Sequence, residues 1–358
     1  MDNYIINNNI RGRGALINTH NKFNKNSFEV FWDDAKYDEE ILHENNQTQY
    51  TEVHPKTIIN KVDSPDVPGD WSMNPYQGCE HGCVYCYARI THEYWGYSAG
   101  KDFEQQIMVK TNAAELLDKK LSSKTWKASP IMLSGNTDCY QPAERKYKIT
   151  RALLEVCLKH NHPVGIITKN ALIIRDLDIL VQLAKKDLVH VHISITTLNE
   201  ELRRTMEPRT SSAKNRLKVV ETLSKNGIPT NVMMAPIIPG LNSDEIFNMT
   251  ESVSKTGAES LSHTVVRLNG AIALLFEDWI QKTFPLKATR VLNLIAQAQG
   301  GKLGNTTFGE RMKGKGAMAE SINQQVRVAR QKFKLQNKLP MFNTQLYKAT
   351  GKQQLQLF

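Results

Sequence analysis

The sequence contains no long apolar run and no secretory signal. Nowhere in its 358 residues does a stretch approach the roughly 18 consecutive apolar residues of a membrane span. The first residues, Met-Asp-Asn-Tyr-Ile-Ile, do not form the basic and then apolar segments of a signal peptide. These absences predict a cytoplasmic protein. A composition of 40% hydrophobic and 23% charged residues is ordinary for a globular chain of one or two domains.

Cysteine is also scarce. The chain has five, an odd number that does not suit a disulfide framework. Three of them, Cys79, Cys83 and Cys86, lie within eight residues in the spacing C-x3-C-x2-C. Cysteine thiolates hold iron–sulfur clusters, and a [4Fe–4S] cluster bound by three thiolates has one iron left to bind a small molecule. Gly78 and Gly82 would allow the backbone to curl tightly around such a cluster.

A zinc site is the alternative for this loop. Structural zinc takes four ligands, usually from cysteine pairs that are separated by two to four residues. The nearest nitrogen ligand, His81, lies inside the loop and would have to wrap awkwardly onto the metal. We therefore predict a cluster, which suits a reducing cytoplasm.

Acidic residues are scarce near the C-terminal end. The net charge is +10, and residues 301–358 contain eleven Lys or Arg but two acids, Glu310 and Glu320. A localised basic region is typical of polyanion binding, and a solvated tail is the alternative. Near the other end, Arg11-Gly-Arg-Gly14 is a flexible basic segment that could contact a phosphate backbone.

Between the ends, short apolar runs alternate with amphipathic stretches. We expect strands at 72–76, 130–134, 164–168, 189–196, 230–236 and 260–267, and helices at 146–160, 175–183, 213–226 and 243–256. This alternation predicts an α/β protein with six βα units in a partial (β/α)6 barrel. The predicted parts are an irregular N-terminal extension (1–65), the barrel core (66–300) and a basic helical C-terminal extension with a flexible tail (301–358).

The cysteine spacing, with Tyr85 between the last two cysteines, resembles the signature loop of the radical SAM enzymes. In that superfamily the open iron binds the amino and carboxylate groups of S-adenosylmethionine, and an electron from the cluster releases a 5′-deoxyadenosyl radical. The resemblance implies a [4Fe–4S] cluster on Cys79, Cys83 and Cys86, with Tyr85 beside the cofactors. It also implies S-adenosylmethionine as the second cofactor and a reductase or flavodoxin-type electron donor.

Polar residues follow the second and third predicted strands, at the edge where the site of such a barrel lies. Radical SAM enzymes have a Gly-Gly-Glu-like segment after the second strand, and it holds the amino group of S-adenosylmethionine. This chain has Gly135, Asn136 and Asp138 there, which could serve the same purpose or form a simple turn. Lys169 ends the third strand at the same edge.

The fourth strand and the segment after it add hydroxyls and a guanidinium. Ser194 and Thr196 share one face of the strand, where they suit the ribose or carboxylate of S-adenosylmethionine. Arg209 could bind a carboxylate through two hydrogen bonds, or it could form a surface pair with Glu207. Arg267, which ends the sixth strand, would face the cavity.

Four longer strings resemble the spore photoproduct lyase-like proteins, a group often labelled DNA repair photolyases: residues 75–89, 136–145, 167–170 and 236–241. The resemblance implies a lyase-like reaction on damaged DNA. Spore photoproduct lyase uses an extra cysteine as a hydrogen-atom donor. Cys139 is the candidate near the rim, with a small buried thiol as its alternative role, and Cys157 is expected in the core.

Two features of the C-terminal extension also point to nucleic acid. The end of the chain resembles the peptide with which bacterial replication and repair proteins dock on the DNA sliding clamp, through Gln354, Leu355, Leu357 and Phe358. These residues could instead pack on the protein's own surface. Upstream, a helix is expected with an apolar stripe (Met318, Ile322, Val326, Ala329, Phe333) and a basic face (Arg327, Arg330, Lys334).

Together these features predict a radical SAM enzyme that acts on DNA. Radical modification of RNA or of a peptide is the first alternative. A peptide substrate would predict the cysteines of an auxiliary cluster, and the two that remain are too few. The second alternative is a nucleic-acid-binding or clamp-binding protein whose cluster is structural or redox-sensing.

Overall fold

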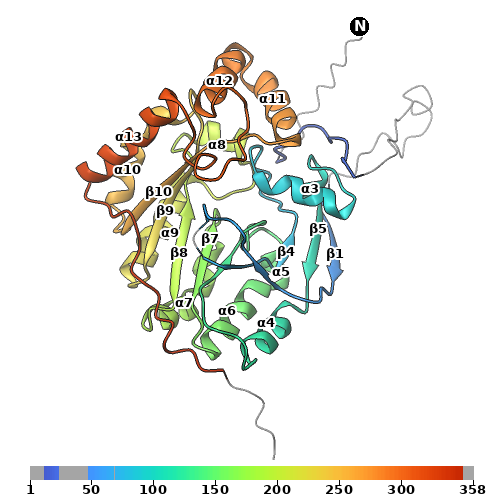
Figure 1. Cartoon of the computed structure of the whole chain (residues 1–358), viewed down its shortest axis with the longest axis vertical. Helices are drawn as coiled ribbons and strands as arrows, with labels where there is room; N and C mark the ends of the chain where they lie inside the picture. Colours follow the sequence, from blue (N-terminus) through green and yellow to red (C-terminus); the bar gives the residue numbers. More distant parts are fainter. Residues whose placement is uncertain (1–11, 24–46, 68, 350–358) are drawn as a thin grey trace, which may run out of the picture.

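A computed structural model of the chain describes residues 12–23, 47–67 and 69–349, and its centre is a seven-stranded sheet (Figure 1). Six strands are parallel, in the order β10-β9-β8-β7-β6-β3, and β2 pairs antiparallel with β3 at one edge. The predicted partial barrel is confirmed. The strands are β2 (Ile59–Lys61), β3 (Trp71–Met73), β6 (Ile131–Leu133), β7 (Val164–Thr168), β8 (Val189–Ser194), β9 (Thr230–Ile237) and β10 (Ser260–Val265).

Helices connect consecutive strands and pack against the sheet and against each other. They lie close to their predicted positions: α6 (Ile149–Lys159), α7 (Leu177–Ala184), α9 (Ala213–Lys225) and α10 (Ile246–Ser254). The limits of α9 follow from its sequence. The Ser212 hydroxyl accepts a hydrogen bond from the N–H of Asn215 at 3.2 Å, and Gly227, with φ of +71°, follows the helix.

The other helical elements surround this framework. They are α3 (Asp102–Gln105), α4 (Ala113–Leu121), α5 (Glu144–Tyr147), α8 (Glu200–Met206), α11 (Ala271–Thr283), α12 (Pro285–Ala298), α13 (Ala317–Lys332) and the 3-10 helices η1 (Tyr87–Trp95), η2 (Ala171–Asp176) and η3 (Ser243–Glu245). Within the described ranges, no helix combines the length and the apolar character that crossing a membrane requires.

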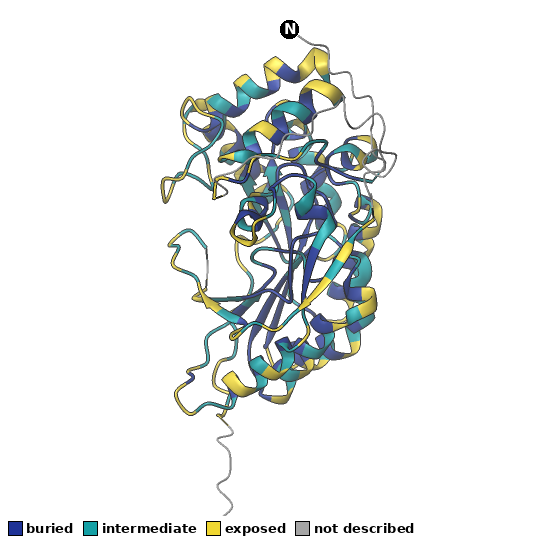
Figure 2. Ribbon diagram, turned by 90° about the vertical axis from the view of Figure 1, so that its right-hand side faces the viewer, coloured by how far each residue is buried: buried dark blue, intermediate teal, exposed yellow. Residues whose placement is uncertain are grey.

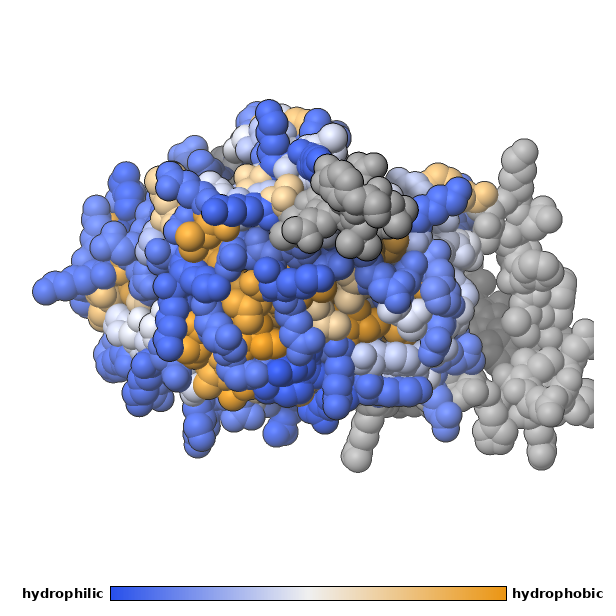
Figure 3. Space-filling model, turned by 90° about the horizontal axis from the view of Figure 1, so that it is seen from below, coloured by the Kyte–Doolittle hydropathy of each residue, from blue (hydrophilic) through white to orange (hydrophobic). Residues whose placement is uncertain are grey.

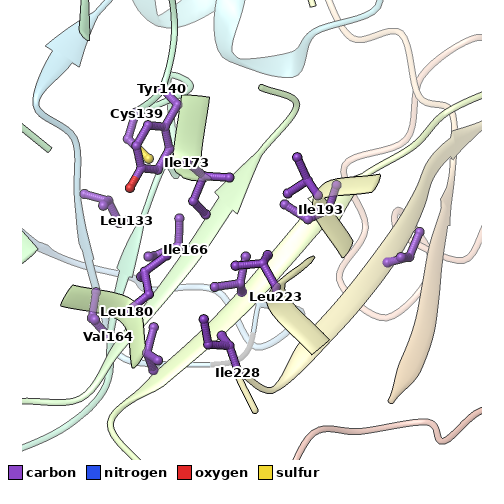
Figure 4. Close-up of a cluster of buried hydrophobic side chains, with 14 of the residues drawn as sticks. Leu133, Cys139, Tyr140, Val164, Ile166, Ile173, Leu180, Ile193, Leu223 and Ile228 are labelled. Atoms are coloured by element: carbon purple, nitrogen blue, oxygen red, sulfur yellow. The ribbon is translucent and has the colours of Figure 1, made fainter. Parts of the chain in front are cut away.

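The central strands β7 and β8 are buried along nearly their whole length because both of their faces are covered. Val164 and Ile166 of β7 and Ile193 of β8 are at most 1% exposed. Figure 4 shows these side chains gathered with Leu180 of α7 and Leu223 of α9. In Figure 2 the central strands of the large sheet are accordingly buried, whereas the outer faces of the surrounding helices are exposed. The sheet and its helices therefore form one apolar core below the ends of the strands.

A second, smaller sheet contains β1 (Gln49–Val53), β5 (Gln106–Lys110) and β4 (Tyr76–Gln77). Its middle strand, β5, is parallel to β1 and antiparallel to β4. The prediction of an irregular segment over residues 1–65 is therefore wrong for β1 and β2. It missed β1 because every residue of Gln-Tyr-Thr-Glu-Val is exposed or half-buried, which leaves no buried face to produce an apolar alternation.

The chain after α12 forms α13, which packs against α10, α12 and β10. Ile322, Val326 and Ala329 of α13 are buried, as the predicted stripe requires. The chain then runs to the end of the barrel where the strands begin (Figure 1). There the N–H of Asn343 donates to the carbonyl of Asp187 at 2.9 Å, and the Tyr347 hydroxyl donates to the carbonyl of Leu121 at 2.6 Å.

This lower end of the molecule carries an apolar area among hydrophilic side chains (Figure 3). Described residues end there, at Ala349. The predicted clamp-binding residues, Gln354, Leu355, Leu357 and Phe358, lie outside the described residues.

The contact of the C-terminal segment with the barrel is testable at Phe342. Its ring stacks on His190 with centroids 3.7 Å apart, whereas the neighbouring Met341 is 91% exposed. We expect Phe342→Ala to lower the free energy of unfolding by about 1–3 kcal/mol, below the range for a fully buried Phe. Met341→Ala should change it by less than about 0.5 kcal/mol. Urea unfolding monitored by circular dichroism measures both, and equal effects would contradict the docking.

Candidate active site

The cysteine loop, residues 78–86, lies over the ends of β6, β7 and β8. The hydroxyl of Thr137, just after β6, donates to the carbonyl of Gly78 at 2.6 Å. The Nδ2 of Asn170, after β7, lies 3.2 Å from Nε2 of His81. The N–H of Val84 donates to the carbonyl of Met206 at 3.1 Å. The loop therefore lies at the carboxyl edge of the sheet, where parallel barrels build their sites.

Glycine allows the loop to turn as predicted. Gly78 and Gly82 have φ of +80° and +67°, which residues with a Cβ rarely adopt. Gly82 also contacts the N-terminal part of the chain very closely, because a Cβ on Gly14 would lie 1.6 Å from the Gly82 carbonyl oxygen. The back of the loop is therefore closed by residues 13–15.

A buried ion pair holds the loop from this side. Arg89, in η1, donates to the carbonyl of Cys83 at 2.9 Å and to the carboxylate of Glu104, and both charged side chains are fully buried. The same carboxylate accepts the N–H groups of Gly14 at 3.0 Å and Ala15 at 2.8 Å. Three segments that are distant in sequence thus meet at one carboxylate.

The structure corrects the interpretation of Arg11-Gly-Arg-Gly14. Arg13 is only 6% exposed, and its guanidinium donates to the carbonyl of Glu104 at 2.7 Å. It is a structural residue behind the loop, so the prediction that it contacts a phosphate backbone is wrong. Arg11 lies outside the described residues.

A second buried ion pair holds the other side of the loop. The Tyr85 hydroxyl donates to the carboxylate of Glu207 and lies 3.2 Å from the Thr196 hydroxyl. Arg216, from α9, donates to Glu207 at 2.9 Å and to the carbonyl of Ser194 at 2.7 Å. Burial alone would raise the pKa of Glu207, but Arg216 and then Lys169 lower it to about 2, so this carboxylate stays charged.

This arrangement also corrects the predicted Glu207–Arg209 pair. Glu207 is paired with Arg216, and Arg209 donates instead to Glu80 at 3.2 Å and to the Thr48 hydroxyl at 3.3 Å. The predicted pair was based on closeness in sequence, but the partner of Glu207 comes from the next helix, α9. The side chain of Arg209 is 35% exposed, so its binding of a ligand carboxylate stays a prediction.

The remaining polar side chains of the loop, Glu80 and His81, also interact with other residues of the protein. Glu80 accepts the N–H of Ala143 at 2.9 Å. His81 lies between the carboxylate of Asp138, 3.2 Å from its Nδ1, and the side chain of Asn170. His81 is therefore not placed to complete a zinc site.

The three thiols suit a cluster. Cys79 and Cys83 are buried and Cys86 is half-buried. Burial raises the pKa of both buried thiols, that of Cys83 to about 12, so their thiolates need nearby positive charge, which iron supplies. Among the described side chains, no three His, Cys, Asp or Glu converge on a single metal position. In a cluster each thiolate binds a different iron, so the three thiols need not meet at one metal position.

The residues after β6 fall into two groups. The carbonyl of Gly135 accepts the hydroxyl of Tyr87, and the N–H of Asn136 donates to Asn74 at 2.8 Å, so both residues lie beside the loop. Both remain predictions for binding the amino group of S-adenosylmethionine. Asp138 is different because its carboxylate makes several hydrogen bonds within the protein.

Asp138 has no acceptor capacity to spare. Its carboxylate accepts the N–H of Tyr140 at 2.9 Å, the Thr168 hydroxyl at 2.7 Å and the N–H of Lys169 at 2.8 Å, and it faces His81. A carboxylate offers about four acceptor sites, and these contacts use them. Asp138 therefore ties β6 to β7 and to the cysteine loop, and its contact with S-adenosylmethionine stays a prediction.

The fourth strand gives a similar division. Thr196 is fully buried and its hydroxyl donates to Glu207, and its contact with a ribose stays a prediction. Ser194 is 3% exposed and stays a prediction. Lys169 lies with its ammonium 5.9 Å from the centroid of the Tyr85 ring. Burial would lower its pKa, but the nearby thiols and Glu207 raise it, so Lys169 brings a positive charge to the site.

Cys139 lies in the wrong place for a hydrogen-atom donor. It is fully buried in the main core, among the side chains of Figure 4. Its N–H donates to the Ser134 hydroxyl at 2.9 Å. A thiol without exposed surface cannot reach a substrate over the strand ends, so the predicted role is wrong. Cys157 is fully buried, as expected.

Tyr87 was not among the predicted site residues. It follows Cys86 directly and is 51% exposed, with its hydroxyl fixed on Gly135. The guanidinium of Arg267, beyond the end of β10, lies 5.7 Å from the Tyr87 ring centroid. The position of Tyr87 directly after Cys86 was a signal in the sequence that could have predicted it as a site residue. These two residues place an aromatic face and a cation beside the cysteine loop.

The fold and this loop define a class of protein: partial α/β barrels with a three-thiol loop over the carboxyl ends of their strands. The chain belongs to the Radical SAM superfamily, whose model matches residues 73–253. The cofactors of this family are a [4Fe–4S] cluster and S-adenosylmethionine. The predicted superfamily is thereby confirmed.

Relatives of known sequence are similar over more than half of the chain. An uncharacterised protein of Mycobacterium tuberculosis is 31% identical over 248 residues, which are 68% of this chain and 73% of that protein. An uncharacterised protein of Methanocaldococcus jannaschii is 30% identical over 198 residues, which are 55% of this chain and 71% of that protein.

Among solved structures, a spore photoproduct lyase mutant gives a TM-score of 0.61 at 16% identity, covering 88% of this chain and 86% of that chain. Spore photoproduct lyase complexed with dinucleoside spore photoproduct gives 0.60 at 16% identity, covering 81% of both chains. At this level of identity the likeness is one of fold.

The proposed cluster ligands can be tested one at a time. We expect Cys79→Ala, Cys83→Ala and Cys86→Ala to lower the iron and sulfide content of anaerobically reconstituted protein from about four of each per chain to below about one. Cys157→Ala is the matched control, because it removes a buried thiol elsewhere in the core. Full iron content in a loop variant, or equal loss in the control, would contradict the assignment.

The second ion pair predicts a stability effect. Glu207→Gln should lower the free energy of unfolding of the cluster-free protein by about 3 kcal/mol, because Arg216 stays buried and charged without a counter-ion. Glu251→Gln, in an exposed pair with Lys255, should cost less than about 0.5 kcal/mol. Urea unfolding under reducing conditions measures both. A loss no larger than that of the control would show that the pair does not support the loop.

Proposed function

We propose that this chain cleaves S-adenosylmethionine reductively and uses the resulting 5′-deoxyadenosyl radical to abstract a hydrogen atom from a lesion in DNA. The observation that carries the proposal is that the other polar side chains of the cysteine loop are bonded within the protein. Glu80, His81 and Tyr85 are bound by the protein, which leaves three thiols for a cluster at the carboxyl edge of a radical SAM barrel.

The chain's own residues have distinct tasks in this proposal. Cys79, Cys83 and Cys86 hold the cluster, which when bound supplies the electron that splits S-adenosylmethionine into methionine and the radical. Gly135, Asn136, Lys169 and Ser194 orient S-adenosylmethionine, with the Lys169 ammonium suited to a carboxylate. The buried pairs of Arg89 and Arg216 keep the loop in place and exclude water from its back.

Nucleic acid is the substrate class that the surface near the site favours. Residues 302–315 contain four basic residues, Lys302, Arg311, Lys313 and Lys315, and one acid, Glu310. This segment lies at the end of β10, where the carbonyl of Leu303 accepts the N–H of Leu268 at 2.9 Å. Tyr87 adds an exposed aromatic face on which a base can stack. The fold likeness to a lyase solved with a dinucleoside photoproduct supports a lyase-like reaction on DNA.

The alternatives have less support. The basic segment suits RNA as well as DNA. A peptide-modifying enzyme with an auxiliary cluster would need more thiols, and Cys139 and Cys157 are both fully buried. A structural or redox-sensing cluster would not require Lys169 and the polar strand ends beside it. Docking on a sliding clamp through the last residues stays a proposal. The last described residues lie at the pole of the barrel where the strands begin (Figure 1).

The proposed reaction predicts a specific isotope transfer. Anaerobically reconstituted protein, reduced with dithionite or a flavodoxin system, should form 5′-deoxyadenosine from S-adenosylmethionine. With deuterated, ultraviolet-damaged oligodeoxynucleotide, deuterium should appear in that product, because the radical takes the hydrogen atom from the substrate. Mass spectrometry measures both, with Cys83→Ala as the blank. Formation of 5′-deoxyadenosine no greater than in the blank ends the enzyme proposal. Deuterium transfer from RNA but not from DNA assigns the alternative substrate.

A further inference from the structure

An ion pair joins the two edges of the open barrel. β2 and β10 lie at opposite edges of the seven-stranded sheet. Asp66, between β2 and β3, accepts the backbone N–H of Gly309 at 2.7 Å and Nε of Arg311 at 2.7 Å. Gly309 and Arg311 belong to the segment after α12, and this segment is fixed to β10, because the N–H of Val265 donates to the carbonyl of Met312 at 2.9 Å.

A second guanidinium beside this pair has no carboxylate of its own. Within the described residues, the hydrogen bond of Arg267 goes to the thioether sulfur of Met312 at 2.7 Å, and sulfur is a weak acceptor. Met312 directly follows Arg311, so this bond holds Arg267 next to the ion pair. After burial, the charge of Arg311 is the main cause of the lowered pKa of Arg267. Two arginines thus lie beside one carboxylate, which is bonded to Arg311, in a half-buried position where unpaired positive charge is costly.

The donors around Asp66 are positioned by other contacts as well. The guanidinium of Arg311 lies over the ring of Phe308, 4.5 Å from its centroid, and its Nη2 donates to the Ser64 hydroxyl. Gly309 has φ of +83°, which aims its N–H toward the same carboxylate. The side chains of Asp66 and Arg311 are 9% and 20% exposed. A backbone N–H and two guanidiniums are therefore prearranged for an anion with oxygen acceptors.

We propose that Gly309, Arg311 and Arg267 form a binding site for a phosphodiester group, and that Asp66 occupies it until substrate phosphate displaces the carboxylate. The proposal rests on the nucleic-acid substrate proposed above. A phosphate group offers the same kind of oxygen acceptor as the Asp66 carboxylate and binds guanidinium in the same forked geometry. With Asp66 displaced, a phosphate at this position meets both arginines instead of one.

The position of the site fits the proposed chemistry. Arg267 stacks on Tyr87, and Tyr87 follows Cys86, so the anion site lies next to the cysteine loop. A backbone phosphate bound there would hold a neighbouring nucleotide over the loop. Asp66 lies in the chain segment that joins β2 to β3. Its displacement would therefore also break the contacts of that segment with the segment after α12.

Removing the charge of Asp66 tests the proposal. We expect Asp66→Asn to bind a fluorescent single-stranded oligodeoxynucleotide about tenfold more tightly than the unmodified chain at about 0.1 M salt, because no carboxylate competes with phosphate. Arg311→Gln should weaken binding and reduce the slope of log affinity against log salt by about one. In the Asp66→Asn, Arg311→Gln double variant the gain should disappear. Fluorescence anisotropy on the full, cluster-loaded chain measures all of these.

Glu221→Gln is the matched control. It makes the same change in net charge at an exposed pair with Lys225, at the far end of α9. A gain in Asp66→Asn no larger than in this control, or a gain that persists without Arg311, would overturn the anion site while leaving the proposed reaction intact. Thermal melting of each variant, with and without oligonucleotide, separates altered binding from altered folding. A variant that binds should melt at a higher temperature when oligonucleotide is present.

A second ligand identifies the source of the phosphate. If inorganic pyrophosphate raises the melting temperature of Asp66→Asn but no oligonucleotide binds, the site takes a small phosphorylated molecule. That result would contradict the nucleic-acid substrate and retain the anion site. If neither ligand binds any variant, the anion site is refuted, whatever the isotope-transfer experiment shows.

Discussion

The cysteine loop depends on the buried carboxylate of Glu104. Arg89 is fully buried, and Glu104 is its counter-ion. Removing the counter-ion of a buried charge typically destabilises a protein by about 3–5 kcal/mol. The same carboxylate also binds two backbone N–H groups of the N-terminal segment. This carboxylate holds the cysteine loop from behind, while Glu207 holds it through Tyr85.

Sequence patterns predicted the parts of the fold that are buried on both faces. The strand β7 (Val-Gly-Ile-Ile-Thr) is largely apolar, and β8 (Val-His-Val-His-Ile-Ser) has an apolar residue at every second position. The spacing of Cys79, Cys83 and Cys86 is a local property of the chain. The small sheet was missed because β1 is exposed and β4 has two residues. The tasks of Asp138, Thr196 and Arg209 stay open for a different reason. A polar residue at a strand end can face a ligand or its own neighbours, and only the tertiary contacts decide which.

The molecule separates its proposed tasks along the barrel axis. The cysteine loop, Tyr87 and the basic segment of residues 302–315 lie at the carboxyl edge of the strands. The segment after α13 docks at the opposite pole through Asn343 and Tyr347. Asp66 and Arg311 connect the two sheet edges at the active end, so the side of the partial barrel is closed by polar contacts and not by further strands. Such contacts can be exchanged for contacts with a charged ligand, whereas strand pairing cannot.

The close approach of Gly14 to Gly82 has a consequence for how the protein matures. Among the described residues, residues 13–15 close the loop from behind, so a cluster has to be inserted from another side. Cys86 is the least buried of the three thiols, so it is the one that a cluster or a thiol reagent arriving from solvent reaches most easily.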